Sequence, residues 1–263
     1  MKKVLKVTLK IAVFFIGWVV CTSIGEINSA NPAIWRFGAE LFPLLWTLLF
    51  TGVFLYMEKG KVKIPVFQNL AKGSAVGFVT GAVWLGMSVG LLTLFGSLHI
   101  TAKNEVGWLG LWIISAFLNT VMQEFLVRGY IYQLLKKEYS VVPAAIVSTV
   151  LFTFMHGGTL EAGLVPVLNV VTMSLFMTAL YEREKTIAAP ILCHAVWNII
   201  GAIILGGVSL ADDYPSLFTM KAAGNALLSG GEYRIEASVV VLALNILLGF
   251  FFYEKSKRKA SAS

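Results

Sequence analysis

Long apolar segments alternate with short polar ones along almost the whole chain. Eight of these segments approach the ~20 apolar residues that a helix needs to cross a bilayer. They are residues 4–24, 37–57, 73–95, 108–134, 141–156, 162–181, 187–207 and 237–253. The pattern predicts an all-α polytopic membrane protein, a bundle of about eight transmembrane helices.

The basic residues between these segments fall on alternate flanks, beginning with the N-terminus. Sixteen lie on that set of flanks, four lie on the other set, and Arg128 lies inside a segment. The sixteen are Lys2, Lys3, Lys6, Lys10, Lys59, Lys61, Lys63, Lys72, Lys136, Lys137, Arg183, Lys185, Lys255, Lys257, Arg258 and Lys259. Because Lys and Arg concentrate in cytoplasmic loops, we expect both termini to be cytoplasmic.

Composition supports a chain embedded in lipid. Hydrophobic residues make up 57% of the 263 and charged residues only 13%, against roughly 25% charged in soluble domains. The polar stretches are too short for a separate soluble domain, so residues 1–263 are expected to form one transmembrane domain. The net charge of +7 is spread over several loops rather than one stripe, which argues against nucleic acid as a partner.

A few ionisable and amide side chains interrupt the apolar segments. Glu124 and Arg128 are four residues apart in segment 108–134, so they share a helical face and can pair. Gln123 precedes them and can still reach the bundle interior. Charged groups at membrane depth are costly and mark a functional site by default. The alternative is a neutralised Glu–Arg pair that only holds helices together.

Two further segments carry histidines. His156 ends segment 141–156, and His194 is followed at i+4 by Asn198 in segment 187–207. Each has a plainer interpretation: an interfacial histidine for the first, and interhelical hydrogen bonding for the second. Together, however, the three segments supply a Glu for a general base, a His to orient water, and a His and Asn to donate to an oxyanion. We therefore expect residues 108–207 to form the catalytic core of a peptide hydrolase.

The order of these residues resembles the CAAX protease and bacteriocin-processing family, also called the Abi family. That family has the motifs Glu-Glu-x-x-x-Arg, Phe-x-x-x-His and His-x-x-x-Asn. Here they read Gln123-Glu124-Phe125-Leu126-Val127-Arg128, Phe152 to His156, and His194 to Asn198. The resemblance implies an intramembrane endopeptidase in which the first Glu activates water and the second-motif His helps to hold it. The third-motif His and Asn would stabilise the oxyanion, and the Arg would order the site or contact the substrate.

The implied substrate is a membrane-associated peptide or a prenylated protein, met within the lipid bilayer. Because the chain is compact, peptide or bacteriocin maturation, or self-immunity, is favoured over prenyl-protein processing. The expected location is a bacterial plasma membrane.

The chain departs from the family at the first motif position, where Gln123 replaces Glu. A glutamine amide cannot accept a proton at neutral pH. Three explanations stay open at this point: a parental Glu deliberately replaced to trap substrate, a natural pseudoprotease, or Glu124 acting as the base. The first is preferred because the other motif residues are intact.

Other chemistries have less support in the sequence. The His-Glu-x-x-His zinc motif, the Gly-x-Ser-x-Gly elbow and the P-loop are absent, as judged against their required spacings. Glu124, His156 and His194 could in principle hold a metal, but no cofactor is expected. Two functions of other classes remain as alternatives: a non-catalytic protein that binds and stabilises a membrane partner, and a transporter for a small substrate.

Overall fold

The computed structural model describes residues 2–261 of the chain. Its long helices are α1 (Lys2–Cys21), α2 (Pro32–Met57), α3 (Leu70–Leu94), α4 (Leu109–Glu124), α8 (Leu164–Glu184) and α11 (Val239–Ser261). The shorter helices are α5 (Tyr130–Glu138), α6 (Val141–Met155), α7 (Gly158–Ala162), α9 (Ala188–Val196) and α10 (Ala226–Ser229). Between them lie the π-helical segments η1 (Phe125–Gly129) and η2 (Trp197–Ile204) and the 3-10 segment η3 (Gly231–Ala237).

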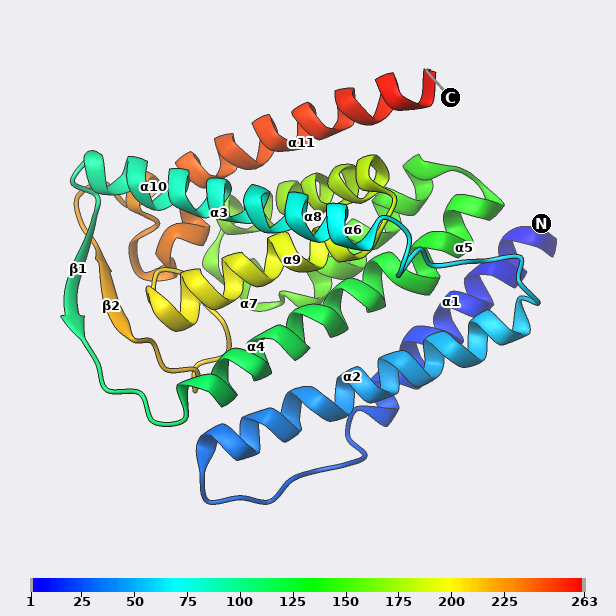
Figure 1. Cartoon of the computed structure of the whole chain (residues 1–263), viewed down its shortest axis with the longest axis horizontal. Helices are drawn as coiled ribbons and strands as arrows, with labels where there is room; N and C mark the ends of the chain where they lie inside the picture. The colour runs from blue at the N-terminus through cyan, green and yellow to red at the C-terminus, as the bar shows by residue number, and fades with distance from the viewer. Residues whose placement is uncertain (1, 262–263) are drawn as a thin grey trace.

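All eight apolar segments predicted from the sequence are helical, which confirms an all-α membrane architecture (Figure 1). Within the described residues, six helices are long and apolar enough to cross a membrane, and one of them runs without a break through α4, η1 and α5. The helices over Val141–Met155 and Ala188–Ile204 are shorter, so the roughly eight expected spans divide into six long helices and two short ones. At 15 residues, α6 is only ~22 Å long, less than the ~30 Å hydrocarbon core.

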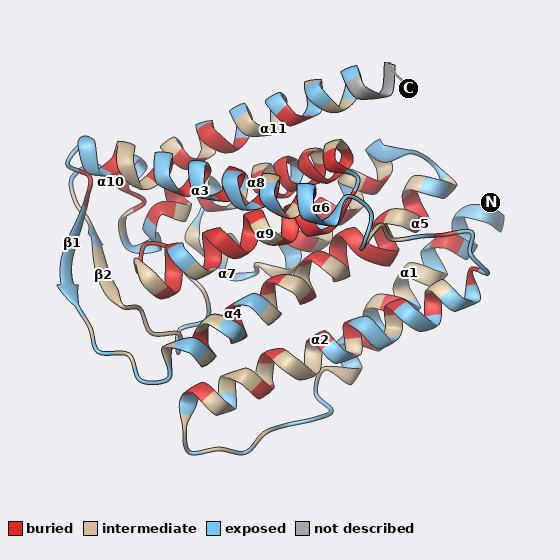
Figure 2. Cartoon of the chain, in the orientation of Figure 1, coloured by how far each residue is buried: buried red, intermediate tan, exposed pale blue. Residues whose placement is uncertain are grey.

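The outer helices present apolar side chains to their surroundings. Large exposed hydrophobic residues recur along α1, α2, α3 and α11, among them Leu5, Leu49, Val79 and Phe250. Buried residues concentrate instead on α8, α9 and the inner side of α4 (Figure 2). Because an apolar outer surface is stable against lipid rather than water, this distribution supports the membrane assignment.

Helices α3 and α9 approach each other closely through glycines spaced four residues apart. A Cβ atom added at Gly77 would lie 2.1 Å from the Ala189 carbonyl oxygen, and one at Gly81 would lie 2.7 Å from that of Cys193. Small residues at such spacing let helix backbones touch inside membranes. The contact fixes the position of α9 and therefore of His194, which it carries.

Two short strands were not predicted. β1 (Leu98–Lys103) and β2 (Phe218–Ala222) pair antiparallel, with Leu98 opposite Ala222. They join the α3–α4 connection to the segment that follows η2, at the end of the molecule away from both termini (Figure 1). His99 is exposed on β1.

Candidate functional site

Glu124 and Arg128 form the buried ion pair that their spacing predicts. Arg128 Nη1 lies 2.9 Å from both carboxylate oxygens of Glu124, and both side chains are fully buried. Arg128 Nη2 also donates to the carbonyl oxygen of Ser174 on α8, at 2.9 Å. Because each charge faces its opposite in the apolar interior, the pair offsets part of its desolvation cost.

Two π-helical segments occur at the motifs. Segment η1 begins directly after Glu124, and η2 contains Asn198. Such widened turns are frequent at functional sites, because they shift the direction in which neighbouring side chains point. The 3.6-residue periodicity used in the sequence analysis carries no signal for them.

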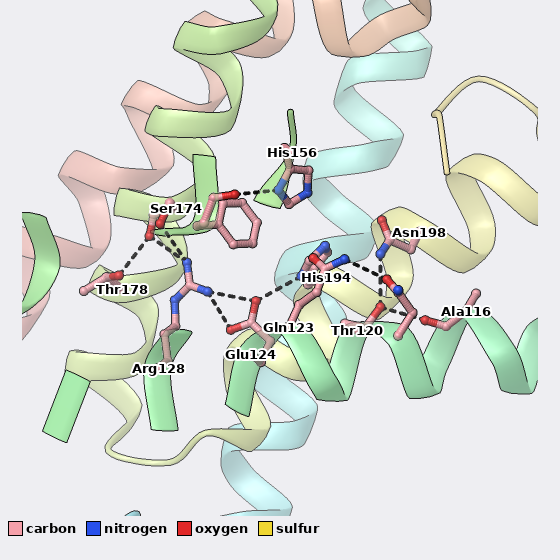
Figure 3. A network of polar contacts seen from close by, with 12 residues as sticks. Ala116, Thr120, Gln123, Glu124, Arg128, His156, Ser174, Thr178, His194 and Asn198 are labelled. Carbon is pink, nitrogen blue, oxygen red and sulfur yellow. Dashed lines mark hydrogen bonds and ion pairs between the residues drawn. The ribbon is translucent and has the colours of Figure 1, made fainter. Parts of the chain in front are cut away.

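His194 contacts the carboxylate of Glu124 from α9. Its Nδ1 lies 2.9 Å from Glu124 Oε1, so Glu124 sits between Arg128 and His194 (Figure 3). Since a carboxylate oxygen accepts hydrogen bonds, Nδ1 carries the proton, and Nε2 is the nitrogen that remains for other partners. This contact crosses 70 residues of chain, and the sequence motifs do not reveal it.

The motif residue Phe152 lies close to both His156 and His194. The Nδ1 atom of His156 lies 2.8 Å from the Phe152 carbonyl oxygen, which again places the proton on Nδ1 and leaves Nε2 available. The Phe152 ring is 4.3 Å from the His156 ring and 5.9 Å from the His194 ring, centroid to centroid. The phenylalanine of the second motif therefore packs against both imidazoles.

The two motif amides bind residues of α4. Asn198 Nδ2 donates to Thr120 Oγ1 at 3.0 Å. Gln123 Nε2 donates to Asn119 Oδ1 at 2.7 Å, while Gln123 Oε1 is buried without a hydrogen-bond partner among the described residues. Position 123, where the related family has its first Glu, thus carries an amide. Its NH₂ group donates a hydrogen bond, and its oxygen accepts none from the described residues.

The hydrogen bonds continue from Asn119 to a carboxylate that the sequence analysis missed. Asn119 Nδ2 donates to Glu40 Oε2 at 2.7 Å, and Tyr214 donates to Glu40 Oε1 at 3.2 Å. Burial and the nearby Glu40 raise the pKa of Tyr214 above its ordinary value, so this phenol stays a donor at neutral pH. Glu40 lies within the apolar segment 37–57, and charged residues at membrane depth mark functional sites. The signal that pointed to the other site residues was therefore also available for Glu40.

A cavity of about 510 Å³ brings four of the six predicted residues together, namely Gln123, His156, His194 and Asn198. Glu40 and Glu236 also line it. The other two predicted residues, Glu124 and Arg128, are fully buried behind this wall rather than on it. The site therefore combines amides, imidazoles and carboxylates in its lining, and an ion pair supports it from behind.

The metal alternative required Glu124, His156 and His194 to converge. Among the described residues, no cluster of three or more His, Cys, Asp or Glu side chains has a geometry that could hold an ion. Glu124 directs its oxygens to Arg128 and His194 instead.

Comparison with known proteins agrees with the motifs. A family model described as “Type II CAAX prenyl endopeptidase Rce1-like” matches residues 105–200. No curated protein matched the chain. The matched segment runs from just before α4 into η2 and contains all six predicted site residues. The resemblance seen in the three motifs is confirmed, and residues 105–200 are similar to the Rce1-like type II CAAX prenyl endopeptidases.

Proposed function

We propose that the chain is an intramembrane endopeptidase of the CAAX protease type, which cleaves a membrane-associated peptide or a prenylated protein within the bilayer. One observation carries the proposal: residues from three motifs far apart in the chain line one cavity. They combine imidazole nitrogens with amide donors, which is the equipment for activating water and stabilising an oxyanion. The family match supports the same reaction class.

In this mechanism the attacking water lies between residue 123 and His156. The free Nε2 of His156 accepts a hydrogen bond from that water. Asn198 uses one amide hydrogen on Thr120 and has a second for the developing oxyanion. His194 donates to the oxyanion from Nε2 only as the imidazolium, because its Nδ1 hydrogen is already used on Glu124. Glu124 acts as a positioning residue, because its carboxylate fixes the tautomer and orientation of His194.

The weak point of the chemistry is Gln123, which supplies no base. Glu124 is a poor substitute, because Arg128 and His194 occupy its oxygens and it does not line the cavity. We therefore propose that hydrolysis by this chain is slow, and that a carboxylate at position 123 completes the site.

The test is the Gln123→Glu variant, reconstituted in liposomes and assayed against a panel of membrane-associated peptides. Cleavage should rise by about 10²–10⁴-fold, the usual contribution of a general base. The rise should disappear when His156→Ala or His194→Ala is added. Equal cleavage by the parent and the variant would contradict the role assigned to position 123.

A second candidate function is a non-catalytic protein that binds and stabilises a membrane partner. It is favoured by the hydrogen bond from Gln123 Nε2 to Asn119, which a carboxylate cannot donate. If both forms leave every peptide intact while both retain the same peptide on an affinity support, this second function replaces the first.

The proposed hydrolysis uses no metal ion. We expect the activity of Gln123→Glu to survive dialysis against a strong chelator, because the proposed base and oxyanion donors are side chains. The measurement is the cleavage rate before and after chelation, with re-addition of Zn²⁺ as the control. A loss that Zn²⁺ reverses would assign the reaction to a metal site.

A further inference from the structure

The cavity has a rim and a floor with different exposure. Its rim contains the exposed residues Gly157, Gly158, Asp212 and Tyr233, while its floor includes the buried His194. The rim comes from the α6–α7 turn, the loop after η2, and η3. The loop after η2 leads into β2, so the mouth lies at the end of the bundle that carries the strands.

The basic flanks meet at the opposite end, as ion pairs between elements show. Lys136 at the end of α5 and Lys185 after α8 both bind Glu182, at 2.6 and 2.8 Å. Lys10 of α1 pairs with Glu58, which follows α2. Figure 1 shows both chain termini at this same end.

Sixteen of the 21 Lys and Arg residues belong to the flanks of that end. The end with the cavity has only four, which are Arg36, Lys103, Lys221 and Arg234. A bias of this size in short flanks sets the orientation of a membrane protein, with the basic side in the cytoplasm.

From the place of the cavity mouth and the distribution of Lys and Arg residues together, we infer that the cavity opens toward the non-cytoplasmic face of the membrane. Its substrate is then a peptide segment on that face, such as an exported peptide or the outer part of a membrane protein. The cleavage itself rests on the function proposed above, whereas the direction of opening does not.

The charge of the mouth narrows the substrate further. Asp212 lines the cavity, and its lining cation Arg36 already pairs with two carboxylates, Glu40 and Asp213. The mouth is therefore acidic on balance, and such a field attracts peptides with basic rather than acidic residues near the cleavage point.

Cysteine labelling in whole cells tests the direction of opening. The background is Cys21→Ser, because Cys21 is partly exposed and Cys193 is buried. Asp212→Cys on the rim should react with a membrane-impermeant maleimide in intact cells. The matched control Lys61→Cys, exposed at the opposite end, should react only in inverted vesicles. Ala211→Cys replaces Asp212→Cys if that variant does not reach the membrane.

The reverse labelling pattern, or labelling of both positions from one side, would overturn the inference. Labelling needs no catalysis, so its result is independent of the proposed function. A second arm uses right-side-out vesicles containing Gln123→Glu, with basic and acidic peptides added outside. Cleavage there supports the inference. Cleavage only in inverted vesicles overturns it, and labelling as expected without any cleavage overturns the proposed function alone.

Discussion

Arg128 is a fully buried cation whose Nη1 contacts both oxygens of one carboxylate. We expect Arg128→Ala to lower the free energy of unfolding by about 3–5 kcal/mol, because Glu124 would keep its charge without this partner. The double variant Arg128→Met with Glu124→Leu should lose much less free energy of unfolding, because it removes both charges together. Thermal unfolding in detergent measures the difference, and equal losses would show that the charge imbalance is not the cause.

The hydrogen bond between Gln123 and Asn119 predicts that the Gln123→Glu change, which completes the proposed site, lowers the stability of the protein. In the chain as it stands, Asn119 Oδ1 accepts from Gln123 while Asn119 Nδ2 donates to Glu40. A glutamate at position 123 removes that donor and places carboxylates on both sides of one amide. We expect Gln123→Glu to destabilise the protein by about 1–3 kcal/mol, the cost of an unsatisfied buried polar group.

The melting temperature of Gln123→Glu, compared with that of Gln123→Met, measures this cost. The methionine variant removes the donor without adding a charge, so it separates the two effects. A glutamate variant as stable as the parent would mean that Asn119 turns its amide toward position 123.

At the scale of elements, the α3–α9 contact decides where His194 lies. Gly77→Ala must push α3 away from the Ala189 carbonyl oxygen, whereas a Cβ at Gly86 on the same helix meets no atom within 4 Å. We expect Gly77→Ala to cost about 1–3 kcal/mol, as overpacking does. Gly86→Ala should instead gain up to about 1 kcal/mol from helix propensity.

Unfolding of the two alanine variants in detergent provides the comparison. Gly77→Ala should also reduce cleavage in the Gln123→Glu background, because α9 carries the imidazole that faces the cavity. If both alanines had the same effect on stability, the close approach of the two helices would not be the determinant.

At the scale of the whole molecule, the two ends of the helix bundle differ in charge and in structure. One end gathers the basic flanks around Glu58 and Glu182. The other joins β1, β2 and the loop that forms part of the cavity rim, and Arg36 binds that loop through Asp213. The helices between them place the polar site away from lipid, where buried charges are tolerable only when paired.

The sequence by itself predicted the helices, their membrane character and six candidate site residues, four of which line the cavity. Apolar runs and the i,i+4 spacings of Glu124–Arg128 and His194–Asn198 are local, and local periodicity is what sequence reports. Only the tertiary structure decided that His194 binds Glu124, that Glu40 joins the network, and that Glu124 lies behind the cavity wall. These contacts join segments about 70 or more residues apart. They depend on helix packing, π-helical turns and glycine contacts, which no single segment encodes.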